Sequence, residues 1–151
     1  VKLFITCMKG INNMTLRENV NQEGKDSEGD DEWTPLMAAA WGEHFQVVKY
    51  LIEQGEADPN IADSDGSNAL HYAAYYNRTT TELIELLLSH ISLDSINKKD
   101  RWERTPLDYA YSNHSPIRQE IIALIRLKGG KANWYDENGR YVGRGNGDLN
   151  D

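Results

Sequence analysis

Few residues in this chain have the types and spacing that catalysis or metal binding requires. The histidines are His44, His71, His90 and His114, and no two of them have the His-x-x-x-His spacing of metal ligands on a helix. Cys7 is the only cysteine, so it can form neither an internal disulfide nor a cysteine-based zinc site. We expect structural or solvent-exposed roles for the histidines. The sequence therefore predicts no metal and no cofactor.

Two segments resemble ligand-binding loops only in part. Gly129-Gly130-Lys131 has the end of a phosphate-binding loop, but Lys131 is followed by Ala132, and Ile125 stands where the first glycine belongs. Residues 26–30 alternate carboxylates as a calcium loop does, yet the glycine and the closing glutamate are misplaced. The sequence contains no nucleophile-elbow motif and no dinucleotide-binding motif. We predict that the protein is not an enzyme.

The composition also argues against nucleic-acid-binding and membrane proteins. The length of 151 residues indicates one domain or two small ones, and a composition of 39% hydrophobic and 26% charged residues is typical of a globular protein. The net charge of -8 disfavours a nucleic-acid partner, because phosphate binding needs a basic surface. No apolar run approaches the roughly 20 residues of a spanning helix, so we expect no membrane insertion. Without a visible secretory signal, and with one cysteine, we expect an intracellular, cytoplasmic location, with the nucleus as an alternative.

An internal repeat indicates the architecture. Asn60-Ile61-Ala62-Asp63 is followed 37 residues later by Asn97-Lys98-Lys99-Asp100, and 36 residues after that by Asn133-Trp134-Tyr135-Asp136. A second series runs Thr34-Pro35-Leu36, Asn68-Ala69-Leu70 and Thr105-Pro106-Leu107. Because the two series keep the same order, the chain is expected to stack copies of one supersecondary unit.

Each unit has the same order of parts. Small residues such as Ala38-Ala39-Ala40 follow the threonine-like triplet, and an apolar pattern such as Val47-Val48-Leu51-Ile52 then gives one broad helical face. Thr34 is expected to cap the first helix, with proline at its first position. Gly55 and Gly129 stand where a left-handed cap would end the second helix. The pattern predicts a turn, a short helix, a turn, a longer helix and a loop.

These units resemble ankyrin repeats over about residues 30 to 142. The resemblance is carried by Gly55-Glu56-Ala57-Asp58-Pro59-Asn60 and Asp63-Ser64-Asp65-Gly66-Ser67-Asn68-Ala69-Leu70-His71-Tyr72-Ala73-Ala74. It implies an all-α solenoid of stacked helix-turn-helix units with short β-hairpin turns. We divide the one continuous domain into a degenerate N-terminal capping repeat with an acidic loop (1–29), repeats at 30–62, 63–99 and 100–135, and a C-terminal hairpin with a frayed tail (136–151). Glu32 and Glu103 depart from the family by standing at hairpin glycine positions.

The resemblance also implies a binding surface. Repeats of this kind form a concave face from hairpin tips and first helices, and we expect a partner protein there. Its residues would lie at the positions that vary in the family, namely Asp31, Trp33, Trp41, Ser64, Asp65, Ser67, Tyr75, Tyr76, Arg101, Trp102, Arg104, Asn113 and Arg140. Trp, Tyr and Arg are the residues most often found at binding hot spots. The alternative is that the aromatic residues brace neighbouring repeats. Trp134, which aligns with Ile61, is expected to pack inside.

The leading interpretation is a non-catalytic protein–protein interaction module, monomeric in isolation, whose partner has basic and apolar features. The alternative is a regulatory or targeting fragment of a larger multidomain enzyme, channel or effector, which would fit a start at Val1. A third hypothesis concerns Asn60, Asn97 and Asn133, which stand where ankyrin repeats are targets of asparaginyl hydroxylation. The competing interpretation is that each asparagine closes its loop by bonding to backbone.

Overall fold

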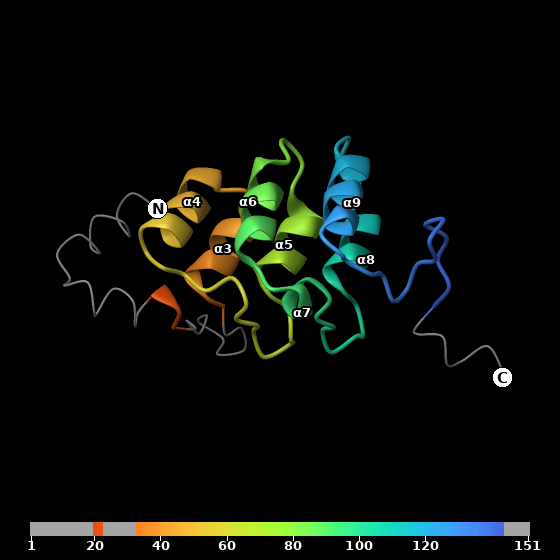
Figure 1. Ribbon diagram of the computed structural model, residues 1–151, viewed down its shortest axis with the longest axis horizontal. Helices are drawn as coiled ribbons and strands as arrows, with labels where there is room; N and C mark the ends of the chain where they lie inside the picture. The colour runs from red at the N-terminus through yellow and green to blue at the C-terminus, as the bar shows by residue number, and fades with distance from the viewer. Residues whose placement is uncertain (1–19, 23–32, 144–151) are drawn as a thin grey trace.

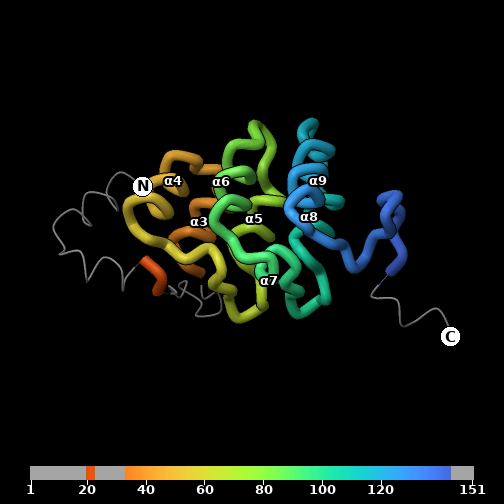
Figure 2. The backbone as a smooth tube through the Cα atoms, in the orientation of Figure 1, coloured from red at the N-terminus to blue at the C-terminus, as the bar shows by residue number. Residues whose placement is uncertain are grey.

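The computed structural model describes residues 20–22 and 33–143 and shows helix pairs stacked along one axis (Figure 1). The helices in chain order are α3 (Pro35–Trp41), α4 (Phe45–Glu53), α5 (Ala69–Tyr76), α6 (Glu82–His90), α7 (Leu93–Ile96), α8 (Pro106–Tyr111) and α9 (Arg118–Leu127). The first helices α3, α5 and α8 pack in one row, and the second helices α4, α6 and α9 form the row beside it. The predicted all-α solenoid is confirmed. The backbone tube in Figure 2 follows the repeated path.

The first helices begin at side-chain caps, as the triplets predict. The Thr34 hydroxyl accepts a hydrogen bond from the Met37 N–H at 3.3 Å, and the Asn68 side chain accepts from the N–H groups of Leu70 and His71. In α8 the cap is reciprocal, because the Asp108 carboxylate accepts from the Thr105 N–H at 2.9 Å while the Thr105 hydroxyl accepts from the Asp108 N–H. Each cap satisfies amide groups that the first turn of a helix leaves unbonded.

The core runs continuously through the stack. Leu36, Leu70 and Leu107, which end the repeated triplets, are at most 2% exposed. Small residues such as Ala40 and Ala74 are fully buried between the first helices, where the absence of a long side chain lets the helices approach closely. Because no unit can bury its apolar face alone, the core exists only through stacking.

Asparagine side chains tie each repeat to the next. The Asn21 Oδ1 accepts from the Asp58 N–H at 2.7 Å, and the Asn60 Oδ1 accepts from the Ser92 N–H at 2.8 Å. The Asn97 Oδ1 likewise accepts from the Lys131 N–H in the following loop, at 2.7 Å. Asn21 therefore acts as the closing asparagine of the preceding unit. The rest of the expected capping repeat and its acidic loop lie outside the described residues, as does the expected tail from residue 144.

The hairpins share one turn, built on an aspartate. The Asp63 Oδ1 accepts from the N–H groups two and four residues later, and Asp100 and Asp136 repeat this pattern. Isolated antiparallel bridges join the residues on either side, at Ala62–Asn68 and Tyr135–Tyr141. The turn needs a positive φ three residues after the aspartate, where Gly66 has 83° and Glu103 has 63°. Glu103, which stands at a hairpin glycine position, therefore adopts a strained backbone conformation.

Two expectations about the loops need correction, and one is confirmed. Gly129 has the expected left-handed φ of 88°, but in the first full repeat Glu56, not Gly55, has the positive φ, at 55°. The short helix α7 was not expected from the sequence. Its first turn is capped by the Ser92 hydroxyl, which accepts from the Ser95 N–H at 3.2 Å. Residues 77–81 separate α5 from α6 and residues 112–117 separate α8 from α9, whereas only residues 42–44 separate α3 from α4.

The hairpin conformation gives a first prediction. Replacing Glu103 by glycine should raise the free energy of unfolding by about 0.5–1 kcal/mol, because glycine adopts positive φ without strain. Gly66→Ala should lower it by about 1–2 kcal/mol, because the new Cβ would also lie 3.3 Å from the Asp100 Cα. Urea unfolding followed by tryptophan fluorescence measures both. Lys99→Ala is the control for the exposed Lys99–Glu103 ion pair. A loss of stability from Glu103→Gly in that background would contradict the argument.

A second prediction concerns pH. Burial lowers the pKa of His71 from 6.5 to about 4, although the nearby Asp100 charge opposes the shift. The side chain is 2% exposed, and its neutral Nδ1 accepts from the Asn68 N–H at 3.1 Å. As pH falls, the unfolded chain takes up the proton before the folded chain does. Stability should therefore be full above about pH 6.5 and fall by about 3 kcal/mol at most as pH is lowered towards 4.

Urea unfolding at several pH values between 7.5 and 4 measures the slope of the free energy of unfolding against pH. His71→Gln is the matched control, since its amide can keep a hydrogen bond but does not titrate. The slope between pH 6.5 and 4 should be shallower in this variant than in the wild type. Equal slopes in the two proteins would show that another group carries the dependence.

Candidate functional site

Aromatic side chains of the first helices and hairpins form one continuous row, which we call the aromatic strip. Successive ring centroids are 4.7 Å apart for Trp33–Tyr72, 6.0 Å for Trp33–Trp41 and 5.8 Å for Trp41–Tyr76. The row continues through Tyr75 to the third repeat, with 4.8 Å for Tyr75–Tyr76 and 5.9 Å for Tyr75–Tyr109. These distances and the tilted or edge-on angles are those that aromatic pairs prefer. The strip comprises Trp33, Trp41, Tyr72, Tyr75, Tyr76 and Tyr109.

Helical spacing places the strip on one side of the stack. Tyr72, Tyr75 and Tyr76 are three and four residues apart in α5 and therefore share a helix face. Trp41 is the last residue of α3, so its ring lies at the same end of its helix as Tyr76. The buried residues of α5, such as Leu70, instead pack into the core.

Two aspartates hold the tyrosine rings of successive repeats. The Tyr72 hydroxyl donates to the Asp63 carboxylate at 2.5 Å, and the Tyr109 hydroxyl donates to Asp100 at 2.6 Å. Burial and the bond to Asp100 raise the pKa of Tyr109 well above its usual range. Burial also raises the pKa of Asp63, against the opposing effect of the Tyr72 hydrogen bond. The rings are thus fixed by the same aspartates that build the hairpins.

The strip is only partly covered by the protein itself. Trp41 is 49% exposed, and Trp33, Tyr75 and Tyr76 are half-buried. Trp33 contacts a ring of the next repeat, so it also braces the stack, as the alternative interpretation proposed. Trp102 lies outside this row, at a hairpin tip, where it is 39% exposed and has the Arg101 guanidinium 4.3 Å from its ring centroid.

Two of the predicted contact residues are buried, and this is a correction. Ser67 is 4% exposed and Asn113 is 1% exposed. The Asn113 side chain donates to the carbonyl oxygens of Ala74 and Asn77, both at 2.9 Å, and thereby joins the two inter-helix loops. Neither side chain is available to a partner.

The charged candidates differ in their partners. Arg101 forms an ion pair at 2.8 Å with Asp65 of the neighbouring hairpin, and Arg140 pairs with Asp136 of its own hairpin at 2.9 Å. Ser64 is exposed at a hairpin tip, and Asp31 lies outside the described residues. The guanidinium of Arg104 lies 4.0 Å from the ring centroid of Trp134 and 5.5 Å from that of Tyr109. Trp134 is 8% exposed, in agreement with its predicted packing role.

The asparagines predicted as hydroxylation targets bond to backbone. The Asn60 amide oxygen accepts from the Ser92 N–H, and the Asn97 amide oxygen accepts from the Lys131 N–H at 2.7 Å. The Asn133 Nδ2 donates to the Glu103 carbonyl oxygen at 2.8 Å. These bonds agree with the loop-closing interpretation, and hydroxylation stays a prediction.

Sequence reasoning missed Tyr72 and Tyr109 as members of the strip. Both are nine residues after a hairpin aspartate, which is the spacing that lets their hydroxyls reach it. This equal spacing was the available signal. It was overlooked because the positions taken as variable in the family do not include these two.

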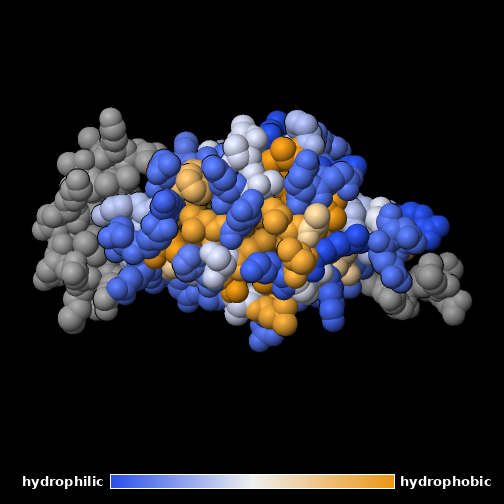
Figure 3. Space-filling model, turned by 45° about the horizontal axis from the view of Figure 1, so that its top comes forward, coloured by the Kyte–Doolittle hydropathy of each residue, from blue (hydrophilic) through white to orange (hydrophobic). Residues whose placement is uncertain are grey.

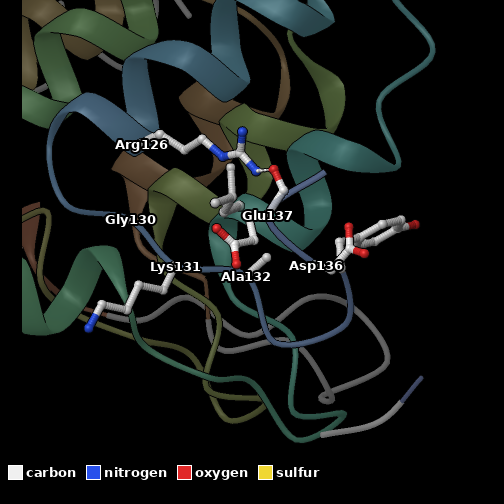
Figure 4. Close-up of a pocket in the computed structure, with 8 residues that line it drawn as sticks. Arg126, Gly130, Lys131, Ala132, Asp136 and Glu137 are labelled. Atoms are coloured by element: carbon white, nitrogen blue, oxygen red, sulfur yellow. Dashed lines mark hydrogen bonds between the residues drawn. The ribbon is translucent and has the colours of Figure 1, made fainter. Parts of the chain in front are cut away.

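Other surfaces offer less to a ligand. A cavity of about 290 Å³ lies between the end of α9 and the C-terminal hairpin, where the Arg126 side chain donates to the Glu137 carbonyl oxygen at 2.8 Å (Figure 4). Hydrophobic side chains also gather across the middle of one face, between hydrophilic ones (Figure 3).

Within residues 20–22 and 33–143, no cluster of three histidine, cysteine or acidic side chains could hold a metal. In the same residues, no helix is long and apolar enough to cross a membrane.

A family model described as ankyrin repeats (3 copies) matches residues 3–93 and 56–136. The chain belongs to the ankyrin-repeat family. This match includes the segment expected to form a degenerate first repeat. Ankyrin repeats are generally protein–protein interaction modules, and a repeat domain of this kind is typically not catalytic.

Curated ankyrin-repeat relatives are much longer than this chain. The ankyrin repeat and SAM domain-containing protein 6 of Mus musculus is 33% identical over 105 residues, which are 68% of this chain and 11% of that protein. The NAD-dependent deacetylase sir2B of Dictyostelium discoideum is 34% identical over 96 residues, 62% of this chain and 12% of that protein. Alpha-latrotoxin-Lg1a of Latrodectus geometricus is 29% identical over 100 residues, 65% of this chain and 7% of the toxin. The chain thus spans about a tenth of the length of these relatives.

The strip gives a third prediction, about stability. Trp41→Ala should change the free energy of unfolding by less than about 1 kcal/mol, because half of the ring is already in water. Trp33→Ala should cost about 2–3 kcal/mol, because Trp33 is half-buried and packs against the hydrophobic core, which Trp41 does not. Urea unfolding compares the two variants. A loss for Trp41→Ala as large as that for Trp33→Ala would make the strip part of the core.

Proposed function

We propose that this chain is a non-catalytic interaction module that binds a segment of a partner protein along the aromatic strip. The continuity of the strip across three repeats, with Trp41 left 49% exposed, supports this function most directly. A row of partly exposed aromatic rings on a rigid scaffold gives large apolar contact area at little cost in side-chain entropy. Single exposed apolar residues need no such explanation, whereas a contiguous row does.

The charge of the chain indicates the character of the partner. Residues 33–96, which carry most of the strip, contain nine acidic and two basic residues. A partner segment with apolar anchors and basic side chains would therefore meet a complementary potential over the first two repeats. Complementary charge of this kind speeds association and excludes acidic competitors more than it adds affinity.

Affinity capture tests this function. Wild-type protein and a Trp41→Ala, Tyr76→Ala variant are immobilised and exposed to lysate from the native source, and mass spectrometry identifies the retained proteins. A specific partner should be kept by the wild type and reduced at least about tenfold in the variant, because hot-spot truncations cost 2 kcal/mol or more. Leu127→Ala is the matched control, since Leu127 is 81% exposed on α9 in the second-helix row.

Unfolding curves and circular dichroism must first show that both variants fold as the wild type does. Equal retention by the strip variant and the wild type would contradict a site on the strip. Loss in the Leu127→Ala control alone would move the site to the second-helix row, where the molecule also presents apolar surface.

The alternative is that the module regulates or targets a larger multidomain protein. The lengths of the relatives favour it, because the matched region is 12% of the deacetylase and 11% of the SAM domain-containing protein. An antibody against this chain, used on native lysate, measures the endogenous polypeptide. A band well above 17.2 kDa would support the alternative, and a band at that mass would contradict it.

A further inference from the structure

Arg104 differs from the other hairpin arginines in having no carboxylate of the described residues as an ion-pair partner. Arg101 and Arg140 each form an ion pair, at 2.8 and 2.9 Å, whereas no ion pair between described residues includes Arg104. Its Nε is buried without a hydrogen-bond partner. The guanidinium also interacts with the Tyr109 hydroxyl, which opposes the raised pKa of Tyr109, and the residue as a whole is part-exposed. The side chain of this part-exposed residue therefore has a desolvated Nε and a positive charge that no carboxylate of the described residues neutralises in an ion pair.

The position of Arg104 places this charge at the end of the aromatic strip. The guanidinium lies 5.5 Å from the ring centroid of Tyr109, the last ring of the strip, and 4.0 Å from that of Trp134. Cation–π contact with two rings restricts the motion of the guanidinium. An arginine that is held in place loses less entropy when it forms paired hydrogen bonds to a planar anion.

Charge is unevenly distributed along the stack. Residues 97–131 contain eight basic and four acidic residues, whereas residues 33–96 contain two basic and nine acidic ones. Residues 97–131 are thus a basic segment of an otherwise acidic chain. A bound segment that follows the strip would pass from an acidic to a basic environment, which selects a segment of the opposite charge order.

We propose that Arg104 binds a carboxylate of the partner segment, an aspartate or glutamate side chain that follows the apolar residues seated on the aromatic strip. This inference rests on the proposed function and specifies the ligand chemistry at one end of the same site. A carboxylate is the favoured class because its two oxygens match the paired donors of a guanidinium. The other interpretation, a purely structural brace for Trp134, makes no distinction between acidic and neutral ligands.

A peptide library tests the proposal without a known partner. Random 12-residue peptides displayed on phage are selected on wild-type protein, and enriched sequences are synthesised in two forms, with the acidic residue or with the corresponding amide. Fluorescence anisotropy then measures Kd on the wild type, Arg104→Gln, Arg104→Lys and Trp41→Ala. Arg118→Gln, a change on the second-helix row, is the control for a general loss of positive charge.

Enriched peptides should carry aspartate or glutamate at one fixed distance from an apolar residue. The acidic form should bind the wild type and Arg118→Gln roughly 10- to 100-fold more tightly than the amide form. The ratio of the Kd of the amide form to the Kd of the acidic form should fall below about twofold on Arg104→Gln. On Arg104→Lys, which keeps the charge but not the paired donors, it should lie between the values for Arg104→Gln and the wild type. Near-identical unfolding curves exclude a folding defect.

Three outcomes overturn the proposal in distinguishable ways. Equal binding of the acidic and amide forms to the wild type removes the carboxylate site, while sensitivity to Trp41→Ala would still support the strip. An acidic preference that survives Arg104→Gln assigns the carboxylate to another residue. Failure to enrich any sequence contradicts both Arg104 and the strip as a site for an extended segment. Conversely, a preference that needs Arg104 but not Trp41 supports the present inference and contradicts the strip.

Discussion

The hydrogen bond from an asparagine side chain to the backbone of the following loop is the interaction on which the stack depends. Asn21, Asn60 and Asn97 each accept from a backbone N–H of the next repeat, at 2.7 to 2.8 Å. A solenoid has contacts only between neighbours, so each interface must be complete by itself. These bonds fix the spacing of the loops. The apolar rows and the aromatic strip, which join neighbouring repeats, depend on that spacing, whereas the helix caps are local to each repeat.

The third repeat caps its first helix with the same geometry as the second repeat but with a different side chain. Where the second repeat has His71 at the third helical position, the third repeat has Asp108, and both accept from the N–H of the cap residue. The carboxylate also accepts from the N–H groups of Asn133 and Trp134, so it holds the C-terminal hairpin. A neutral imidazole could not accept all of these bonds at once. Asp108 thus lets the stack end in a hairpin that no further helix pair covers in the described residues.

The sequence was informative at the starts of the first helices, where local chemistry determines the conformation, although it did not reveal the locally capped helix α7. Thr34, Asn68 and Thr105 predicted the helix starts because capping involves residues within one turn. Burial in the loops could not be predicted in the same way. Asn113 faces inward because its amide meets carbonyl groups of the previous repeat, 36 and 39 residues away. The nine-residue spacing of Tyr72 and Tyr109 from their aspartates indicates the hydroxyl contacts, but the contacts of these rings with Trp33 and Tyr75 depend on how neighbouring helices pack.

The rings that offer apolar surface to a partner also join one repeat to the next. Trp33 reaches Tyr72, and Tyr75 reaches Tyr109, so the strip crosses two repeat interfaces. Because Asp63 and Asp100 hold the tyrosine hydroxyls, the rings are ordered before any ligand arrives, and binding costs less side-chain entropy. A segment lying along the strip would contact neighbouring repeats together and stabilise their interface by mass action. Binding and the cohesion of the stack are therefore coupled through the same side chains.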